Sequence, residues 1–287
     1  MSQRLCVIGA GTMGVGIAYV AATAGFDVEL VEVDPVRAAA TRDILDAQWA
    51  RAVERGKLTD ASAADARTRV AIRRDVAEVA HGPDVVVEAV PESLALKRAV
   101  LAAAEALDPD LLASNTSSLS IGELGEPLSR PGRFLGLHFF NPVWAMPLLE
   151  IVVGPATAAE TSAAALALAG RLGKDPIVVR DAPGFATSRL GVALGLEAMR
   201  MVADGVASAA DIDKAMVLGY RHPMGPLELT DMVGLDVRLD IARTLQAAYG
   251  ERFAPPDLLE RMVAEGRLGH KSGEGFCRWV DGVRGQP

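Results

Sequence analysis

The sequence predicts an α/β fold: a doubly wound, mostly parallel sheet, followed by a smaller domain built only of helices. Three observations lead to this prediction. A glycine-rich turn over residues 9–14 joins a short apolar run to an alanine-rich segment. Apolar runs such as Val85-Val86-Val87 recur between helical segments, which is typical of parallel strands buried on both faces. After residue 184, only helical patterns remain.

Composition and charge narrow the class of protein. The chain has 287 residues, of which 50% are hydrophobic, which is enough for one large core and a second smaller one. A formal net charge of −8 argues against a nucleic-acid partner. The two cysteines, Cys6 and Cys277, indicate reduced thiols in a reducing compartment. We therefore expect a cytoplasmic enzyme, and we see no spacing of residues that would hold a metal.

The stretch from Leu5 to Phe26 is nearly free of charge, yet we do not expect it to enter a membrane. Its glycines would weaken a membrane helix, and an alternating strand pattern follows it at residues 27–34. The sequence therefore predicts no membrane partner and no targeting segment.

The glycine-rich turn has the spacing of a dinucleotide fingerprint, in the order Gly9-Ala10-Gly11-Thr12-Met13-Gly14. The first glycine permits a tight turn, the second lets backbone N–H groups approach a pyrophosphate, and the third lets helix and strand touch. The helix that follows supplies a partial positive charge at its N-terminus. Because a strand precedes the turn and a helix follows it, the context predicts a Rossmann-type domain that binds a dinucleotide.

An acidic residue ends the second predicted strand and favours NAD over NADP. Glu32 follows the alternating run and could accept hydrogen bonds from the adenosine ribose, while repelling a 2′-phosphate. Asp34 is the competing candidate, but its position before Pro35 is typical of a helix N-cap. We therefore expect Glu32 to bind the ribose.

The remaining elements follow in alternation. We expect helices over residues 35–56, 94–107 and 157–173, and strands over 70–72, 85–87, 111–114, 134–137, the run ending at 151, and 177–179. Helices alone are expected over 185–204, 208–218, 231–249 and 256–265. The predicted domains are therefore residues 1–184, which bind NAD, and residues 185–287, which form a helical domain for substrate binding and dimerisation.

A histidine and a glutamate in neighbouring apolar runs suggest acid/base chemistry. His138 lies in the first run and Glu150 in the second, so a carboxylate could orient an imidazole in a cleft. A half-buried structural histidine is the alternative on spacing alone. Polar residues also follow two strands, at Glu88–Glu92 and at Asn115–Ser118, where open α/β sheets bind ligands. The second group could equally be an ordinary helix cap.

In combination, seven motifs resemble the L-3-hydroxyacyl-CoA dehydrogenases, in the single-function form that includes 3-hydroxybutyryl-CoA dehydrogenase. The motifs are Gly9–Gly14, Val87–Glu92, Ser114–Leu119, His138–Pro142, Pro183–Phe185, Pro223–Pro226 and Gly269–Phe276. The resemblance implies reversible oxidation of a 3-hydroxyacyl thioester by NAD, a role in fatty acid metabolism, and a helical domain that forms a homodimer.

The resemblance also implies roles for single residues. His138 would be the base, with Glu150 as its orienting partner. Ser117 would be a hydrogen-bonding neighbour of the substrate oxygen, and Asn141 would help to organise the same site. Contacts with the nicotinamide half of the cofactor would come from Glu92, Lys97 and Asn115, and contacts with the CoA phosphates from Arg55 and Lys57.

Several positions depart from the family pattern, among them Ser188, Trp144 and the bulky residues 220–222 before Pro223. Ser188 stands where the family has asparagine and offers fewer hydrogen bonds to a substrate, while Trp144 replaces a small residue or proline. Both changes suggest a substrate other than plain 3-hydroxybutyryl-CoA. Two alternatives stay open: a dehydrogenase of a free hydroxy acid or sugar acid, of the lambda-crystallin or L-gulonate type, and an NAD-binding protein without turnover.

Overall fold

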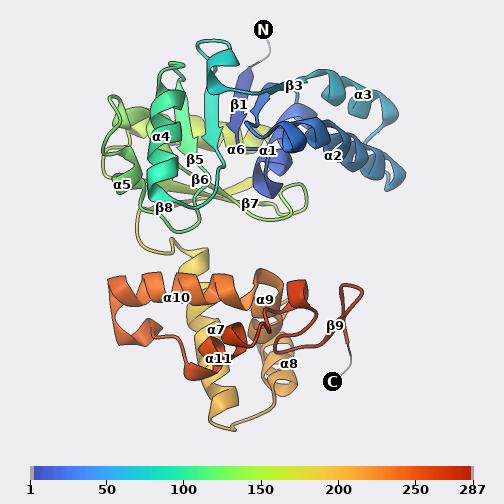
Figure 1. The fold of residues 1–287 in the computed structure, drawn as a ribbon, viewed down its shortest axis with the longest axis vertical. Helices are drawn as coiled ribbons and strands as arrows, with labels where there is room; N and C mark the ends of the chain where they lie inside the picture. Colours follow the sequence, from blue (N-terminus) through green and yellow to red (C-terminus); the bar gives the residue numbers. More distant parts are fainter. Residues whose placement is uncertain (1–2, 286–287) are drawn as a thin grey trace. The chain divides into compact units, whose positions relative to one another are not determined.

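The protein divides into two compact units, Met1–Ala182 and Pro183–Pro287, in a computed structural model that describes residues 3–285 (Figure 1). The first unit is built around one large sheet, and the second consists mainly of helices. Each unit has a buried hydrophobic cluster of its own.

The sheet of the first unit has eight strands in the order β3-β2-β1-β4-β5-β6-β7-β8. All neighbouring strands run parallel except β6 and β7, which are antiparallel. The strands are β1 (Arg4–Ile8), β2 (Asp27–Val31), β3 (Val70–Arg73), β4 (Val85–Glu88), β5 (Leu111–Ser114), β6 (Phe134–Phe139), β7 (Leu148–Val153) and β8 (Asp175–Arg180). The predicted fold class, a mostly parallel doubly wound sheet, is confirmed.

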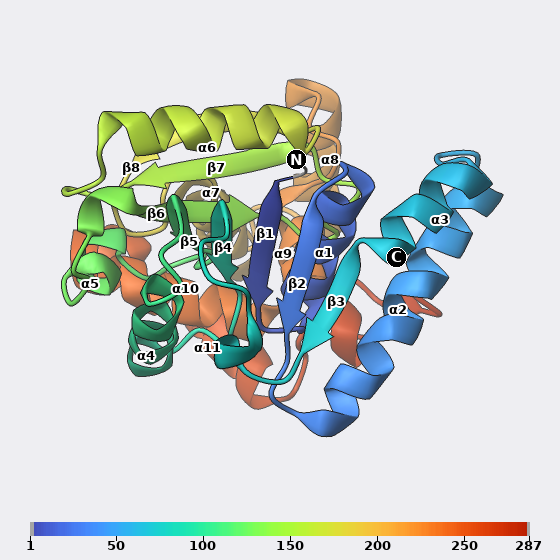
Figure 2. The same ribbon diagram turned by 90° about the horizontal axis from the view of Figure 1, so that it is seen from above.

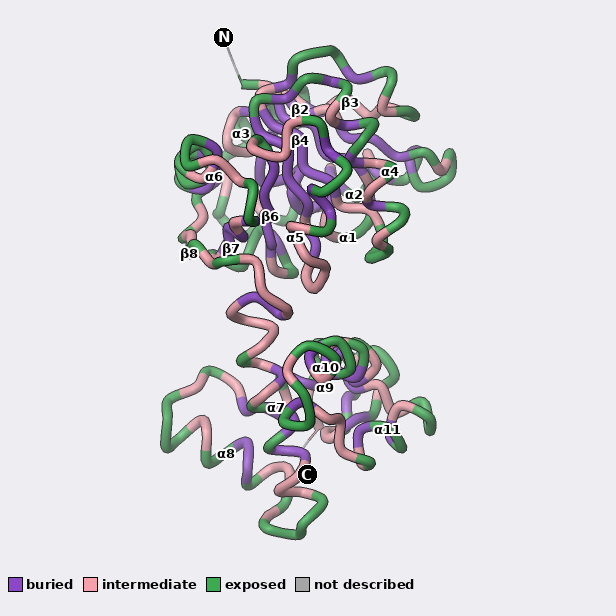
Figure 3. The backbone as a smooth tube through the Cα atoms, turned by 90° about the vertical axis from the view of Figure 1, so that its left-hand side faces the viewer, coloured by how far each residue is buried: buried purple, intermediate pink, exposed green. Residues whose placement is uncertain are grey.

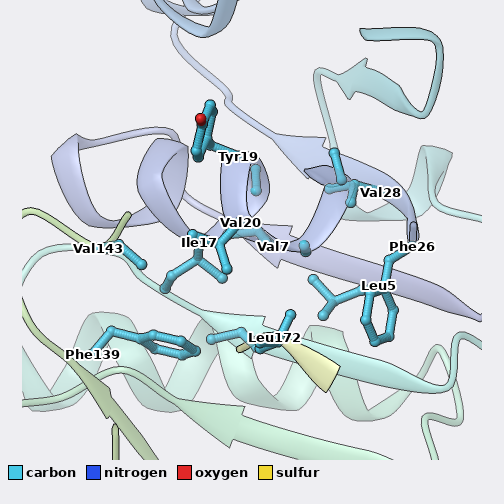
Figure 4. Close-up of a cluster of buried hydrophobic side chains, with 14 of the residues drawn as sticks. Leu5, Val7, Ile17, Tyr19, Val20, Phe26, Val28, Phe139, Val143 and Leu172 are labelled. Carbon is cyan, nitrogen blue, oxygen red and sulfur yellow. The ribbon is translucent and has the colours of Figure 1, made fainter. Parts of the chain in front are cut away.

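Helices cover both faces of this sheet (Figure 2). They are α1 (Thr12–Thr23), α2 (Pro35–Glu54), α3 (Asp60–Thr68), α4 (Leu94–Glu105), α5 (Ile121–Gly125) and α6 (Ala159–Arg171). Side chains of α1 and of the end of α6 pack with Leu5, Val7 and Phe139 in one cluster (Figure 4). A Cβ on Gly136 of β6 would instead meet Ile121 of α5, so α5 lies on the opposite face. Helix α3 was not predicted from the sequence, because no helix or strand was expected over residues 57–69.

Successive side chains of a strand point to opposite faces, which decides where the polar strand residues lie. Val87, Ala113 and Leu137 belong to the cluster beneath α1 and α6. Their neighbours Glu88, Ser114 and His138 therefore point to the other face, as does Glu150, which pairs with His138 across β6 and β7. All four are buried, in agreement with the buried strands in Figure 3. The sheet thus collects its buried polar groups on the face covered by α4 and α5.

The second unit contains α7 (Thr187–Ala203), α8 (Ala209–Tyr220), α9 (Pro226–Val233), α10 (Leu235–Tyr249) and α11 (Asp257–Ala264). The prediction of one helix over 231–249 was wrong, because Gly234, with φ of +103°, separates α9 from α10. The expectation of helices alone was also wrong. Residues Trp279–Val280 (β9) and Val283–Arg284 (β10) form a small antiparallel hairpin, and the nearby buried carboxylate of Asp231 accepts the Trp279 indole N–H at 2.9 Å.

Candidate active site

The turn between β1 and α1 fits the pyrophosphate of a dinucleotide. Gly9 has a φ of +104°, which favours glycine, and a side chain there would meet the backbone of Ala89. A Cβ on Gly14 would lie 1.7 Å from the carbonyl oxygen of Gly9, so helix and strand can touch only through glycine. A Cβ on Gly11 would meet no atom within 4 Å, and no side chain among residues 3–285 caps α1. Open space therefore lies before the first N–H groups of α1, where a phosphate binds favourably.

Glu32 lies directly after β2, beside this turn, and is buried. Its Oε2 accepts the backbone N–H of Ala10 at 3.2 Å, and its Oε1 accepts that of Asp34 at 2.9 Å. The exposed guanidinium of Arg37 lies 3.2 Å from Oε1. Asp34 caps α2 instead, accepting the N–H groups of Val36 and Arg37 at 2.9 Å each. The structure therefore gives Asp34 a capping role and leaves Glu32 as the carboxylate held beside the nucleotide turn.

His138 and Glu150 face each other across the antiparallel pair β6 and β7. Nδ1 of His138 lies 2.7 Å from Oε2 of Glu150, and the exposed fractions of the two side chains are 9% and 0%. The ring of Phe140 lies 4.4 Å from the imidazole, between centroids. A carboxylate at this distance favours the tautomer with the proton on Nδ1 and stabilises the imidazolium when it forms. The pair has the geometry that general acid/base catalysis requires.

A second glutamate organises the turn after β5. Oε1 of Glu92 lies 2.6 Å from the Thr116 hydroxyl and accepts the backbone N–H groups of Ser117 at 3.0 Å and Ser118 at 3.1 Å. Burial raises the pKa of Glu92, but the Lys97 ammonium and these hydrogen bonds outweigh it and lower the pKa below its ordinary value. Glu92 is therefore a carboxylate at neutral pH, and it fixes the backbone that carries Ser117.

Asn115 joins the ends of two strands. Its side-chain Oδ1 accepts the backbone N–H of Phe139 at 2.9 Å, and its backbone N–H donates to the backbone carbonyl of Glu88 at 2.8 Å. The residue after His138 is thereby linked to the end of β5. The carboxyl ends of β4 and β5 and the end of β6 meet in one hydrogen-bonded group.

Glu88 was expected at a strand end that binds ligands, but its partners were not predicted, and no role was predicted for Ser114. Lys97 of α4 makes an ion pair with Glu88, with Nζ 2.8 Å from Oε1, and the Ser114 hydroxyl donates to Oε2 of Glu88 at 2.6 Å. A usable signal was present, because Glu88 ends an otherwise apolar strand in which a charge needs a buried partner.

The remaining predicted site residues lie elsewhere in the chain. Asn141 follows β6 and is exposed, and Met13 packs against the core cluster. Arg55 and Lys57 are exposed at the C-terminal end of α2. Ser188 is half-buried in the first turn of α7, in the second unit.

Metal binding and thiol chemistry can also be judged from the described residues. Among residues 3–285, no group of three His, Cys, Asp or Glu side chains is placed to hold a metal ion. Burial raises the pKa of Cys6 to about 12 and, more than its neighbouring charges, raises that of Cys277 to about 11, so both stay protonated at neutral pH. Within the same residues, no helix has the length and apolar character to cross a membrane.

Both parts of the chain match models of one family. Residues 4–182 match the NAD binding domain of 3-hydroxyacyl-CoA dehydrogenase, and residues 184–279 match its C-terminal domain. The chain is 42% identical over 277 residues to a probable 3-hydroxybutyryl-CoA dehydrogenase of Bacillus subtilis, covering 96% of each. The crystal structure of (S)-3-hydroxybutyryl-CoA dehydrogenase PaaH1 from Ralstonia eutropha superposes with a TM-score of 0.92 at 36% identity, covering 98% of this chain and 100% of that one. A diketoreductase structure superposes with a TM-score of 0.84 at 29% identity, covering 97% and 99%.

The fold, the nucleotide turn and the matched NAD binding domain define the class as an NAD-dependent dehydrogenase. The chain belongs to the 3-hydroxyacyl-CoA dehydrogenase family. The resemblance inferred from the seven motifs is therefore confirmed, as is NAD as the cofactor.

Proposed function

We propose that this protein transfers hydride reversibly between NAD and the C3 hydroxyl of an L-3-hydroxyacyl-CoA. The observation that carries the proposal is the buried pair of His138 and Glu150, with 2.7 Å between Nδ1 and Oε2. The pair belongs to the sheet whose β1–α1 turn fits the pyrophosphate of NAD. The family match supports the substrate class.

His138, assisted by Glu150, would accept and return the proton of the reaction. NAD, when bound, supplies the acceptor for the hydride that leaves C3. Nε2 of His138, the ring nitrogen remote from Glu150, takes the hydroxyl proton, and the Glu150 carboxylate stabilises the resulting imidazolium. In the reductive direction, the imidazolium returns its proton to the oxygen at C3.

Other residues would hold the reactants in place. We assign Ser117 and Asn141 to the substrate oxygen, and Glu92 and Asn115 to the nicotinamide side of the site. The hydrogen bonds that order residues 115–118 support this assignment, because an ordered turn can orient a ligand at low entropic cost. Arg55 and Lys57 are exposed cations suited to the CoA phosphates.

The helical unit would bind substrate through Ser188 and form a homodimer. Its surface carries large apolar side chains on α7 and α8, among them Leu190, Leu218 and Tyr220, which are 65%, 70% and 76% exposed. Exposed apolar groups of this size often mark subunit interfaces. We also assign the protein to the cytoplasm, and its two free thiols, Cys6 and Cys277, support a reducing compartment.

The direct test compares a thioester with the corresponding free acid. NADH oxidation is followed with acetoacetyl-CoA and, in parallel, with acetoacetate at equal concentration. We expect turnover with the thioester alone. Turnover of acetoacetate at a similar kcat/KM would favour the second candidate, a dehydrogenase of free acids; one similar structure is that of a diketoreductase, which catalyses reactions of dicarbonyl compounds. Measurable NADH binding without turnover of either compound would contradict both.

Acyl chain length offers a separate prediction. Ser188 is shorter than the asparagine of the family pattern, and the ring of Trp144 packs edge-on against Tyr19, with 6.1 Å between centroids. Each feature would change the surface that its own unit offers to the acyl chain, so we expect the highest kcat/KM with a 3-hydroxyacyl-CoA other than the four-carbon one. Steady-state rates with a series of chain lengths check this, and a clear optimum at four carbons would contradict it.

A further inference from the structure

Glu88 and Lys97 form a buried ion pair that the proposed proton transfer does not use. Their exposed fractions are 0% and 1%. Nζ of Lys97 lies 2.8 Å from Oε1 of Glu88, 3.0 Å from the carbonyl oxygen of Val90 and 3.3 Å from Oε2 of Glu92. An ammonium has three donors. Because three acceptors inside the protein surround it, the Lys97 ammonium is held in one place.

The partners of Glu88 show what this pair holds together. Oε1 of Glu88 accepts the backbone N–H of Val90 at 2.6 Å, and Oε2 accepts the hydroxyl of Ser114 at 2.6 Å. Glu88 ends β4, Ser114 ends β5, and Lys97 comes from α4. The ion pair therefore joins two strand ends to the helix that covers them.

Glu92 extends this group to the site. Its Oε2 lies beside the Lys97 ammonium, while its Oε1 accepts the N–H groups of Ser117 and Ser118. A continuous series of hydrogen bonds and ion pairs thus runs from Glu88 through Lys97 and Glu92 to the backbone of Ser117.

We propose that Glu88 and Lys97 are positioning residues that hold Glu92, so that the turn over residues 116–118 presents Ser117 in one fixed place. This role rests on the proposed function, in which Ser117 contacts the substrate oxygen. Misplacement of a reacting group by about 1 Å can lower a rate by about 10²-fold.

A merely structural role can be separated from this one. Replacing both members of a buried ion pair by apolar side chains is often neutral for folding, whereas removing one leaves an unpaired buried charge. The test variant is therefore Glu88→Leu/Lys97→Met. If the pair served folding alone, such a variant would keep the turn and the activity.

The experiment measures hydrogen exchange at the amides of Ser117 and Ser118, and kcat/KM with acetoacetyl-CoA, in the wild type and in this variant. We expect a folded protein with at least tenfold faster exchange and a kcat/KM about 10²-fold lower. Ser117→Ala should lower kcat/KM at least tenfold in the wild type. In the double variant it should lower it by less than threefold, because the fixed place of Ser117 is already lost.

Arg69→Met is the matched control. Arg69 also bridges two carboxylates, Asp27 at 3.1 Å and Asp65 at 2.7 Å, but at the amino ends of β2 and β3. We expect it to leave exchange at Ser117 and kcat/KM within twofold of the wild type. Should the double variant not fold, Glu88→Gln/Lys97→Met removes both charges, keeps nearly the shape of Glu88 and gives the same comparison.

Unchanged exchange at Ser117 in a folded variant would overturn the proposal, whatever the activity. An effect of Ser117→Ala of equal size in both backgrounds would overturn it too. Absence of turnover in the wild type would contradict the proposed function instead, and the exchange measurement would still decide what the ion pair holds.

Discussion

Two buried carboxylates on the same face of the sheet each lie beside a nitrogen group, and the two pairs differ in the kind of nitrogen group. In the first, the imidazole of His138 lies 2.7 Å from Glu150 across two antiparallel strands. In the second, the ammonium of Lys97 lies 2.8 Å from Glu88 between a helix and a strand. Both carboxylates are 0% exposed.

The chemistry of the two nitrogen groups separates their roles. An imidazole is the side-chain group whose ordinary pKa lies near neutral pH, whereas an ammonium offers three hydrogen-bond donors and no acceptor. The first pair is therefore suited to proton transfer, and the second to holding its neighbours. The comparison shows that burial and distance alone do not identify a catalytic pair.

The largest expected effect comes from Glu150→Gln, which removes the charge that stabilises the imidazolium. We predict a decrease in kcat on the order of 10²–10⁴ with acetoacetyl-CoA, because acid/base catalysis by His138 is lost. NADH affinity should change by less than threefold, since Glu150 lies on β7, away from the β1–α1 turn. Fluorescence titration of NADH checks the second value. A kcat within tenfold of the wild type would remove the distinction between the two pairs.

Glu32 is a third buried carboxylate, but the cation beside it is exposed. The guanidinium of Arg37 lies 3.2 Å from Oε1 of Glu32, and the Arg37 side chain is 64% exposed. We predict that Glu32→Ser lowers kcat/KM with NADH by about 10-fold to 100-fold. The reason is that the variant lacks the carboxylate expected to accept a hydrogen bond from the adenosine ribose, a charge-assisted bond of about 1.5–3 kcal/mol. Activity with NADPH should rise, because Arg37 becomes available to a 2′-phosphate.

The matched control for Glu32→Ser is Glu32→Ser/Arg37→Ala, in which the gain with NADPH should disappear. An unchanged ratio of kcat/KM for the two cofactors in the single variant would show that Glu32 does not contact the ribose.

The smallest expected effect concerns the pH dependence of stability. Because the pKa of Glu92 is lower in the folded protein than its ordinary value of 4.5, the unfolded chain binds more protons near that pH. Glu92 therefore stabilises the fold above about pH 4.5, and this contribution is lost as pH falls through the folded pKa.

We predict that Glu92→Gln lowers the free energy of unfolding by an amount on the order of 1 kcal/mol at neutral pH. The difference from the wild type should shrink in acid. Urea unfolding at several pH values checks this, and a difference that does not depend on pH would contradict it.

The sequence was sufficient to predict the sheet, the nucleotide turn and the family. A tight turn needs glycine at particular positions, as at residues 9, 11 and 14, and a strand buried on both faces needs an apolar run, such as Val85–Val87. Both features can be recognised from the local sequence alone. The direction of β7 was less evident, although the eight residues between Phe139 and Leu148 are too few for the crossover that a parallel strand needs.

The site could be predicted only in part, because its partners are distant in sequence. His138 and Glu150 were recognised as a possible pair, but their register depends on the pairing of β6 with β7. The bonds of Glu88 to Ser114 and Lys97 depend on which face each strand residue occupies. Local patterns carry no direct information on such contacts.

The most direct test of the account is kcat for His138→Ala with acetoacetyl-CoA and NADH, measured beside the NADH dissociation constant. We expect kcat to fall by a factor on the order of 10²–10⁴, with the NADH dissociation constant within threefold of the wild type. A variant that keeps turnover within tenfold of the wild type would contradict the central claim that His138 and Glu150 transfer the proton.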